Sequence, residues 1–304
     1  MTHTLFRRNM KKDAVTTCRY EPIRTDTIRY EPIRRRSLPI RYDTNRYATT
    51  RRVFVSLLLV AVVLVTHAFE FKDESLNYRI MYKWGIVNKQ AGHATLSLRT
   101  SGNHYNLMLT AASEPWADKF YRVRDTLSGV VEAATFRPQV YRKMSHEGGD
   151  HKHDVVTYTF SGNTVVGTCT RKKWDKNYTL KVDEKRTLTA EGMTVDMLSS
   201  FYYMRNRPYQ SWQAGHTIRV NLFSGKRKEL LTIRYLGIET VKIDRKEYRA
   251  YHISFTFTDP QKPKNQTSDP MEAWISADDA RIPVKLEGKL KVGKVQCFFT
   301  GKSY

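Results

Sequence analysis

The sequence predicts a mainly β fold: an antiparallel curved sheet, half-barrel or barrel-like, with one helix packed on it. Three observations support this prediction. Apolar and polar residues alternate in many short segments from residue 77 onward. Turn sequences separate these segments at intervals of about 8–12 residues, which is typical of an antiparallel barrel or sandwich. One segment, 194–205, has its apolar residues at helical spacing instead.

The expected strands follow one another with short connections. Segment 93–99 alternates strictly, as a half-buried strand does, and Gly148-Gly149 and Gly162-Asn163 have the composition of hairpin turns. Segment 116–124 fits a helix or a strand equally well. The predicted strands are 78–84, 93–99, 104–112, 126–132, 138–146, 153–160, 163–171, 177–183, 216–223, 228–238, 247–258, 271–276, 282–290 and 294–300.

Segment 194–205 is the predicted helix. Five apolar residues recur at the spacing of one helical face: Met197, Leu198, Phe201, Tyr202 and Met204. Such a face would cover an open sheet. Either Asp196 or Thr194 has the residue type and position that suit an N-terminal cap. The strands and this helix are expected to form a single β-rich domain over residues 75–302.

Residues 53–68 form the one long apolar run, and Arg51 and Arg52 precede it. The run is shorter than the ~20 apolar residues that a spanning helix needs. Its positive flank, its length and its small residues Thr66 and Ala68 fit a cleavable signal peptide. A retained membrane anchor and a buried core helix are the alternatives. We therefore expect an exported, periplasmic or envelope-associated protein that contacts the membrane only through 53–68, if that run is not cleaved.

Residues 1–52 are expected to be a disordered basic extension. The hexapeptide RYEPIR occurs at 19–24 and again at 29–34. Proline at this interval prevents a long helix, and the apolar content is too low to offset the entropy of ordering the chain. The extension is either a cytoplasmic arm that binds anionic groups or a translated upstream stretch that the native protein lacks.

The net charge indicates an anionic partner. The chain carries a net charge of +22, and residues 53–304 account for +13 of it. A basic surface attracts nucleic acid, anionic lipid or acidic glycans. Since export separates the protein from nucleic acid, we expect a lipid or an anionic envelope component, and no nucleic acid. A basic surface without a dedicated partner is the alternative.

Several motifs resemble one known family. GHATL at 92–96 resembles a G-x-A-x-L element, and VRD at 123–125 with FRP at 136–138 resembles the family's central element. DMLSSFYYMR at 196–205 resembles its D-x-L-S-x-x-Y-x-x-R helix. WISADD at 274–279, followed by RIPVKLEG at 281–288, resembles its W-x-S-x-D…R-x-P-V closing hairpin.

In this order the motifs are similar to those of the exported bacterial proteins called domain of unknown function 3108, over about residues 77–300. The resemblance implies an exported, mostly antiparallel β-domain like the curved open sheets of periplasmic lipoprotein carriers. It implies no activity.

The candidate chemical groups are few. No catalytic residue and no cofactor is predicted. His151 and His153 are weak candidates for metal ligands, because they share one face of a strand, but a solvated hairpin tip explains them as well. Cys169 and Cys297 remain if the leader is removed, and they either pair in an oxidising compartment or stay buried free thiols.

Aromatic residues are the strongest candidates for binding. An apolar groove for a lipid or another hydrophobic ligand is the first functional hypothesis, and ordinary core packing is the alternative for the same residues. A structural or assembly protein of the envelope, without a small-molecule ligand, is the second hypothesis. An envelope hydrolase is the third. The candidate groove residues are Phe201, Tyr202, Tyr203, Trp212 and Trp274.

Overall fold

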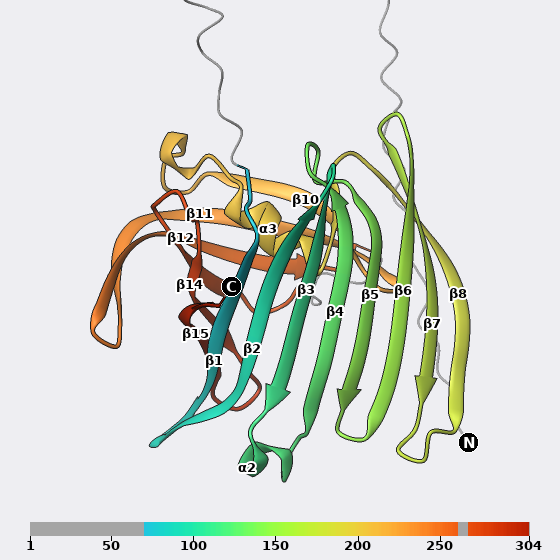
Figure 1. The fold of residues 1–304 in the computed structure, drawn as a ribbon, viewed down its shortest axis with the longest axis horizontal. Coiled ribbons are helices and arrows are strands. Elements are labelled where there is room, and N and C mark those ends of the chain that lie inside the picture. The colour runs from blue at the N-terminus through green and yellow to red at the C-terminus, as the bar shows by residue number, and fades with distance from the viewer. Residues whose placement is uncertain (1–69, 261–266, 304) are drawn as a thin grey trace, which may run out of the picture. The chain divides into compact units, whose positions relative to one another are not determined.

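The computed structural model describes residues 70–260 and 267–303 (Figure 1). The description below concerns the unit of residues 67–304. The predicted extension 1–52 and the predicted signal or anchor 53–68 lie outside the described residues.

Fifteen strands of the described residues form one sheet, in the spatial order β8-β7-β6-β5-β4-β3-β2-β1-β15-β14-β13-β12-β11-β10-β9. The strands are β1 (Glu74–Trp84), β2 (Val87–Ser101), β3 (His104–Ser113), β4 (Val123–Glu132), β5 (Pro138–Glu147), β6 (Asp150–Ser161), β7 (Thr164–Trp174), β8 (Leu180–Glu191), β9 (Thr194–Asp196), β10 (Thr217–Ser224), β11 (Arg227–Ile243), β12 (Lys246–Thr258), β13 (Met271–Ser276), β14 (Pro283–Lys289) and β15 (Lys294–Ser303). The helices are α2 (Pro115–Asp118), α3 (Ser199–Arg205) and the 3-10 turn η1 (Tyr209–Ser211).

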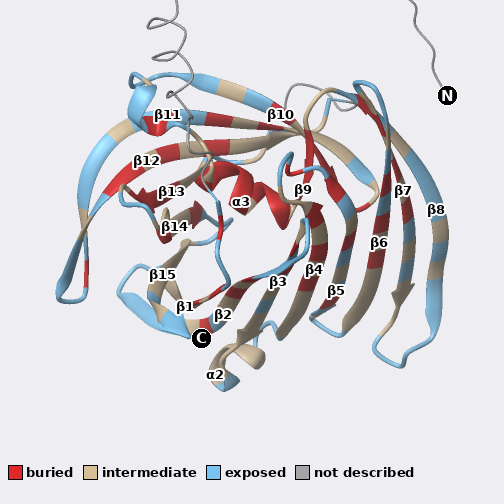
Figure 2. Cartoon of the chain, turned by 45° about the horizontal axis from the view of Figure 1, so that its top comes forward, coloured by how far each residue is buried: buried red, intermediate tan, exposed pale blue. Residues whose placement is uncertain are grey.

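The predicted fold class is confirmed. Neighbouring strands pair antiparallel throughout the sheet except for β9 with β10, which run parallel. The sheet curls until it is nearly closed, and α3 lies inside the curve (Figures 1 and 2). The ambiguous segment 116–124 holds the end of α2 and the start of β4. Of the helices within the described residues, none combines the length and the apolar character needed to span a membrane.

The prediction of a helix over 194–205 is wrong at its start. Thr194, Val195 and Asp196 form β9, which pairs with residues 221–223 of β10, and all three are buried. The helix begins only at Ser199 because the Asp196 carboxylate accepts hydrogen bonds from the backbone N–H groups of Leu198 and Ser199, at 2.8 Å each. The backbone N–H of Asp196 in turn donates to the Ser199 hydroxyl.

The buried carboxyl of Asp196 makes stability depend on pH. Burial raises its pKa to about 6 from 3.8, although the hydrogen bonds from Ser199 and Leu198 oppose the shift. Its Oδ2 atom is buried and has no hydrogen-bond partner among the described residues. Since the folded pKa lies above the unfolded one, the full stability is present below pH about 4 and is lost as the pH rises through 6.

Asp196→Asn should remove this pH dependence, because the amide oxygen can accept the same two hydrogen bonds and does not ionise. We expect the free energy of unfolding of the variant, relative to the parent, to rise by about 3 kcal/mol between pH 4 and pH 7. Urea unfolding at several pH values measures this difference. Parallel profiles for the two proteins would contradict the assignment.

Side chains close the seam between the two ends of the sheet. The Asn221 amide on β10 donates to the Glu191 carbonyl at the end of β8, at 2.8 Å. Lys228 Nζ on β11 donates to the Thr189 carbonyl of β8, at 2.8 Å. Phe223 of β10 is fully buried and stacks on Tyr158 of β6, with ring centroids 5.9 Å apart. No backbone ladder joins β8 to β10 in the described sheet.

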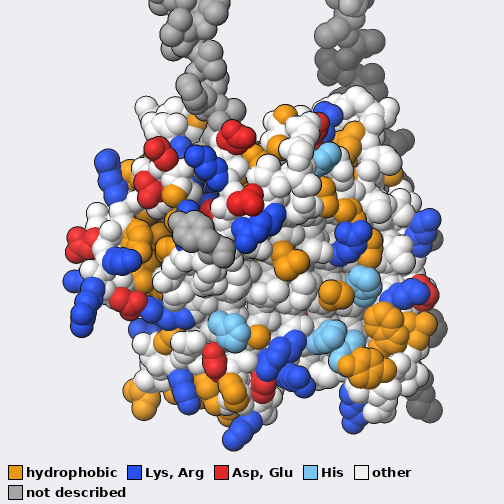
Figure 3. Space-filling model, viewed as in Figure 1, with side chains coloured by type: hydrophobic (Ala, Val, Ile, Leu, Met, Phe, Trp, Pro, Cys, Tyr) orange, Lys and Arg blue, Asp and Glu red, His pale blue; other side chains and the backbone are white. Residues whose placement is uncertain are grey.

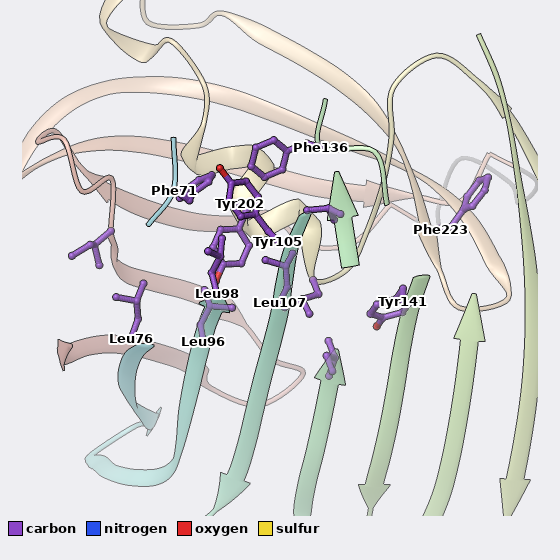
Figure 4. Packing of buried hydrophobic residues seen from close by; sticks show 14 of the residues in the cluster. Phe71, Leu76, Leu96, Leu98, Tyr105, Leu107, Phe136, Tyr141, Tyr202 and Phe223 are labelled. Atoms are coloured by element: carbon purple, nitrogen blue, oxygen red, sulfur yellow. The ribbon is translucent and has the colours of Figure 1, made fainter. Parts of the chain in front are cut away.

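Aromatic packing holds α3 inside the curve of the sheet (Figure 4). The Tyr202 ring is fully buried and meets the Phe71 ring edge-on, with centroids 5.2 Å apart. Phe71 also contacts Tyr105 of β3 and Phe136 of the β4–β5 connection. Such edge-to-face pairs add specific stabilisation to the burial of apolar area.

A buried ion pair fastens α3 to the first strand. Arg205 is 0 % exposed, and its guanidinium donates two hydrogen bonds to the carboxylate of Glu74, which is 6 % exposed. Arg205 also donates to the backbone carbonyl of Arg281 at 2.7 Å and to that of Ala280 at 3.1 Å. The helix is thereby joined to β1 and to the β13–β14 connection.

The two cysteines of the described residues, Cys169 and Cys297, do not form a disulfide. Cys169 on β7 is buried and Cys297 on β15 is partly buried, and both are free thiols. Burial raises the pKa of each thiol to about 11. Neither is a reactive thiolate at neutral pH.

Candidate functional site

An apolar pocket opens at the end of the sheet opposite α3. Its volume is about 620 Å³. Ile80 and Tyr82 of β1, Ala111 of β3 and Val123 of β4 line it, and α2 adds Trp116 and Ala117. Ligand pockets in proteins measure ~300–1,000 Å³, so the pocket is large enough for a small molecule.

The alternation of side chains along β1 explains why the wall that β1 gives to the pocket is apolar. Leu76 and Tyr78 are buried in the core around α3. Successive side chains of a strand point to opposite faces, so Ile80 and Tyr82 lie on the same inner face, further along the strand. The seven residues of α3 do not reach this far, and the inner face continues past the core as the pocket wall.

Local contacts hold α2 across the pocket. Trp116 Nε1 donates to the backbone carbonyl of Gln90 at 2.6 Å, and Lys89 Nζ lies 4.7 Å from the centre of the Trp116 ring. Arg124 of β4 binds the Asp118 carboxylate at 2.7 Å. Hydrogen bonds from Arg124 and from Ser113 lower the pKa of Asp118, so the carboxylate stays charged at neutral pH.

A polar cluster lies beside the pocket and reaches it through Tyr121. Tyr121 lines the pocket, and its hydroxyl donates to Glu147 Oε2 at 3.4 Å. Lys143 Nζ lies 3.6 Å from Glu147 and 3.7 Å from Asp125. Burial and the neighbouring Glu147 raise the pKa of Asp125. Burial also acts on Glu147, but hydrogen bonds with Ser145 and Asp125 and the charge of Lys143 outweigh it and lower that pKa.

A smaller apolar hollow, of about 190 Å³, lies between α3 and the strands β12 to β15. Phe201 and Met204 of α3 line it together with Phe255 and Leu286. Val295 of β15 lines both this hollow and the larger pocket. The apolar inner face is therefore continuous from the helix to the open end.

The structure separates the five aromatic residues that the sequence offered as one groove. Phe201 lines the smaller hollow, whereas Tyr202 points into the core and Tyr203 lies under the Arg207 guanidinium, 3.8 Å from it. Trp212 follows η1 and packs on His216, with ring centroids 4.3 Å apart. Trp274 lies on the other face of β13 from Ala273 and Ile275, stacked on His252 at 4.4 Å. Their role in binding stays a prediction.

The two weak metal candidates lie on β6. His151 stacks on Tyr178, with ring centroids 4.2 Å apart, and meets His146 edge-on at 4.7 Å. Within residues 70–260 and 267–303 no group of three or more His, Cys, Asp or Glu side chains is arranged to hold a metal ion.

Sequence reasoning missed the residues of the larger pocket. The sequence places Ile80 and Tyr82 in a strand but does not show which face of that strand lines a cavity. Trp116 lies in segment 116–124, which fits a helix or a strand equally well. One signal was present in the sequence: the turns Gly85-Ile86 and Leu290-Lys291-Val292 contain apolar residues where polar ones are usual. Apolar residues in exposed turns indicate a surface that contacts another molecule.

Comparisons with known proteins give a family and a fold. A family model described as "Protein of unknown function (DUF3108)" matches residues 77–300. No curated protein matches the chain. Among solved structures, the chain is similar to a β-barrel-like protein of domain of unknown function DUF1849 from Brucella abortus, with a TM-score of 0.55. Sequence identity is 10%, and the alignment covers 77% of this chain and 98% of that chain.

A second solved structure is more distant. The chain aligns with a protein of YmcC-like fold from Bacteroides fragilis, with a TM-score of 0.30 and 8% identity, over 77% of this chain and 97% of that chain. At such identities the first likeness shows the fold alone.

Proposed function

The chain belongs to the DUF3108 family, as its motifs predicted, and we propose that it binds the apolar chain of an amphiphile, such as a fatty acid or a lipid, in the pocket that α2 covers. The location is the cell envelope, and this part of the proposal is based on the signal-like run 53–68.

The size and the apolar lining of the pocket carry the proposal. Its walls are the inner faces of β1 and β3 and the side of α2, and the smaller hollow at α3 extends the apolar surface inward. Removing a hydrocarbon chain from water into such a lining is worth about 0.8 kcal/mol per methylene group. A long acyl chain would therefore bind by contact area alone, without a specific polar anchor.

The polar cluster that Tyr121 joins to the pocket supports an amphiphile over a plain hydrocarbon. The cluster of Glu147, Asp125 and Lys143 contains both signs of charge. It can face the headgroup of a ligand whose chain lies along β1. Lys152 Nζ lies 3.8 Å from Glu147, so with it the two acidic and two basic groups balance, which suits a zwitterionic or hydroxylated headgroup.

Filling the pocket should abolish binding. In the full chain, Ala111→Trp places an indole on the inner face of β3, and we expect the affinity for acyl chains to fall at least tenfold. Thr110→Trp is the matched control, because the adjacent residue of a strand points to the opposite face and Thr110 is exposed. Displacement of a fluorescent fatty acid measures the affinity.

A thermal-shift titration with acyl chains of increasing length completes the test. A ligand that binds only the folded state raises the melting temperature by mass action, so the parent chain and Thr110→Trp should show shifts that grow with chain length. Absence of a shift at any length, or equal binding by Ala111→Trp and Thr110→Trp, would exclude the pocket as the site. A structural role in the envelope would then be the better explanation.

A further inference from the structure

Exposed apolar side chains surround the mouth of the pocket. Of the thirteen exposed large hydrophobic side chains in the described part of the chain, seven lie on the three connections around the mouth. We call these seven the apolar rim: Trp84, Ile86, Val87, Phe120, Tyr121, Leu290 and Val292. Ile86 is 103 % exposed and Phe120 is 82 % exposed, so neither side chain stabilises the fold by its burial.

Three neighbouring connections carry the rim. The β1–β2 and β14–β15 hairpins lie side by side because β1 pairs with both β2 and β15. The Tyr82 hydroxyl joins them by donating to the Val292 carbonyl at 3.1 Å. The connection that contains α2 is held to the start of β2 through Trp116 and Gln90. All three connections lie at the lower edge of the sheet in Figure 1.

Turn geometry does not account for these residues. The β1–β2 turn needs Gly85, which has a φ of 53°. The next position, Ile86, carries a β-branched side chain where turns usually have Asn, Asp, Ser or Gly. The β14–β15 turn needs Gly293, with a φ of 75°, but not Leu290 or Val292. Exposed apolar patches of this kind mark interaction sites.

The same connections are basic. Segments 83–89, 116–122 and 289–294 together contain seven Lys or Arg residues and one Asp, and that Asp118 is paired with Arg124. Figure 3 shows Lys and Arg side chains beside hydrophobic ones along the lower edge of the molecule. Five exposed lysines have no described carboxylate within ion-pair distance: Lys83, Lys89, Lys119, Lys289 and Lys291.

We propose that the apolar rim docks on the surface of a membrane that contains anionic lipid. The rim side chains enter the boundary between headgroups and acyl chains, and the lysines lie among the headgroups, as in other interfacial segments that combine both residue types. A second copy of this chain fits the surface less well, because a symmetric contact would bring the unpaired lysines of both copies together.

Docking would turn the mouth of the pocket toward the membrane, so an acyl chain could enter without crossing water. This consequence depends on the proposed function. The docking itself depends only on the rim and its lysines, and it holds even if the pocket binds nothing.

The test measures binding of the full chain to vesicles. We compare Ile86→Ser/Val292→Ser with Leu236→Ser/Ile238→Ser, a matched pair on β11 that is also exposed and lies away from this edge of the sheet, next to Tyr235, which packs on Tyr209 of η1. Vesicles of phosphatidylcholine with about 30% phosphatidylglycerol are sedimented or floated with each protein. We expect the partition coefficient of the rim variant to fall about tenfold or more, since two apolar contacts are lost, and that of the control to match the parent.

Salt and lipid charge supply the second measurement. Parent binding should weaken as salt is raised and on vesicles of phosphatidylcholine alone, because salt screens the attraction between lysines and headgroups. Equal binding by the rim variant and the parent would overturn the proposal, since the membrane contact would then lie elsewhere in the chain. The proposal would also be overturned if the parent did not bind vesicles, or if the parent bound neutral and anionic vesicles equally well. The rim variant should still bind monomeric fatty acid, which separates a failure of docking from a failure of the pocket.

Discussion

Replacing Glu74 with alanine is expected to lower the free energy of unfolding by about 3–5 kcal/mol, because the variant leaves the Arg205 guanidinium buried without its counter-charge. Arg205 is 0 % exposed and cannot reach water unless α3 moves away from the sheet. The two backbone carbonyls that it also contacts, of Ala280 and Arg281, neutralise no charge. Chemical denaturation of the variant and the parent measures the loss.

The double variant Glu74→Leu/Arg205→Leu separates the lost pair from the lost packing. Removing both charges should recover much of the stability, since buried ion pairs can often be replaced by apolar side chains. The recovery should be incomplete, because the carbonyls of Ala280 and Arg281 lose a donor. If the double variant is less stable than Glu74→Ala, the ion pair is not the main reason for the loss.

Phe223→Ala is expected to cost about 3–5 kcal/mol, the range for a fully buried phenylalanine. Phe223 is 0 % exposed and packs across the seam on β6 and β7. A Cβ added at Gly167 of β7 would come within 2.6 Å of the Phe223 ring, so the ring occupies space that only glycine leaves free. Losing the ring would open a cavity where the sheet closes.

Thermal and urea unfolding of Phe223→Ala should be compared with Met108→Ala, which removes a side chain that is 46 % exposed on β3. The Met108 variant should change stability by less than ~0.5 kcal/mol. Gly167→Val should also destabilise, because the added methyl groups would collide with the Phe223 ring. Equal effects of Phe223→Ala and Met108→Ala would mean that the seam is not packed as described.

The core and the pocket have one cause in common. A short helix such as α3 covers only part of a broad concave sheet, and its seven residues fill one end of this curve. Around Tyr202 the packing leaves little space, as the ring contacts with Phe71 show. Toward the other end only the four residues of α2 lie over the inner side chains of β1 and β3, and the pocket is the result.

The sequence determined the strands and the family. Alternation placed each predicted strand on the chain, because a half-buried strand must repeat every second residue. The pairs Gly148-Gly149 and Gly162-Asn163 marked hairpins correctly, since each contains a glycine with positive φ. Motifs such as DMLSSFYYMR also identified the family without knowledge of the fold.

Local pattern misjudged several boundaries: β2 begins six residues before the predicted strand 93–99, β8 spans Leu180–Glu191 and not 177–183, and the helix starts late. Thr194 and Asp196 have the residue types of an N-terminal cap, yet residues 194–196 form β9, because pairing with β10 satisfies their backbone groups at the sheet edge. A segment of three residues is too short for its pattern to distinguish a helical turn from a strand that is buried on both faces.

Only the tertiary structure decided the site. Alternation says which residues of a strand share a face, but not which face is concave or which strand ends lie together. The Glu74–Arg205 pair joins residues 131 positions apart, and the pocket brings Ile80 and Ala111 together with Val295. The aromatic residues of 201–203 are adjacent in sequence but point to different surroundings. A helix turns by ~100° per residue and so directs neighbouring side chains apart.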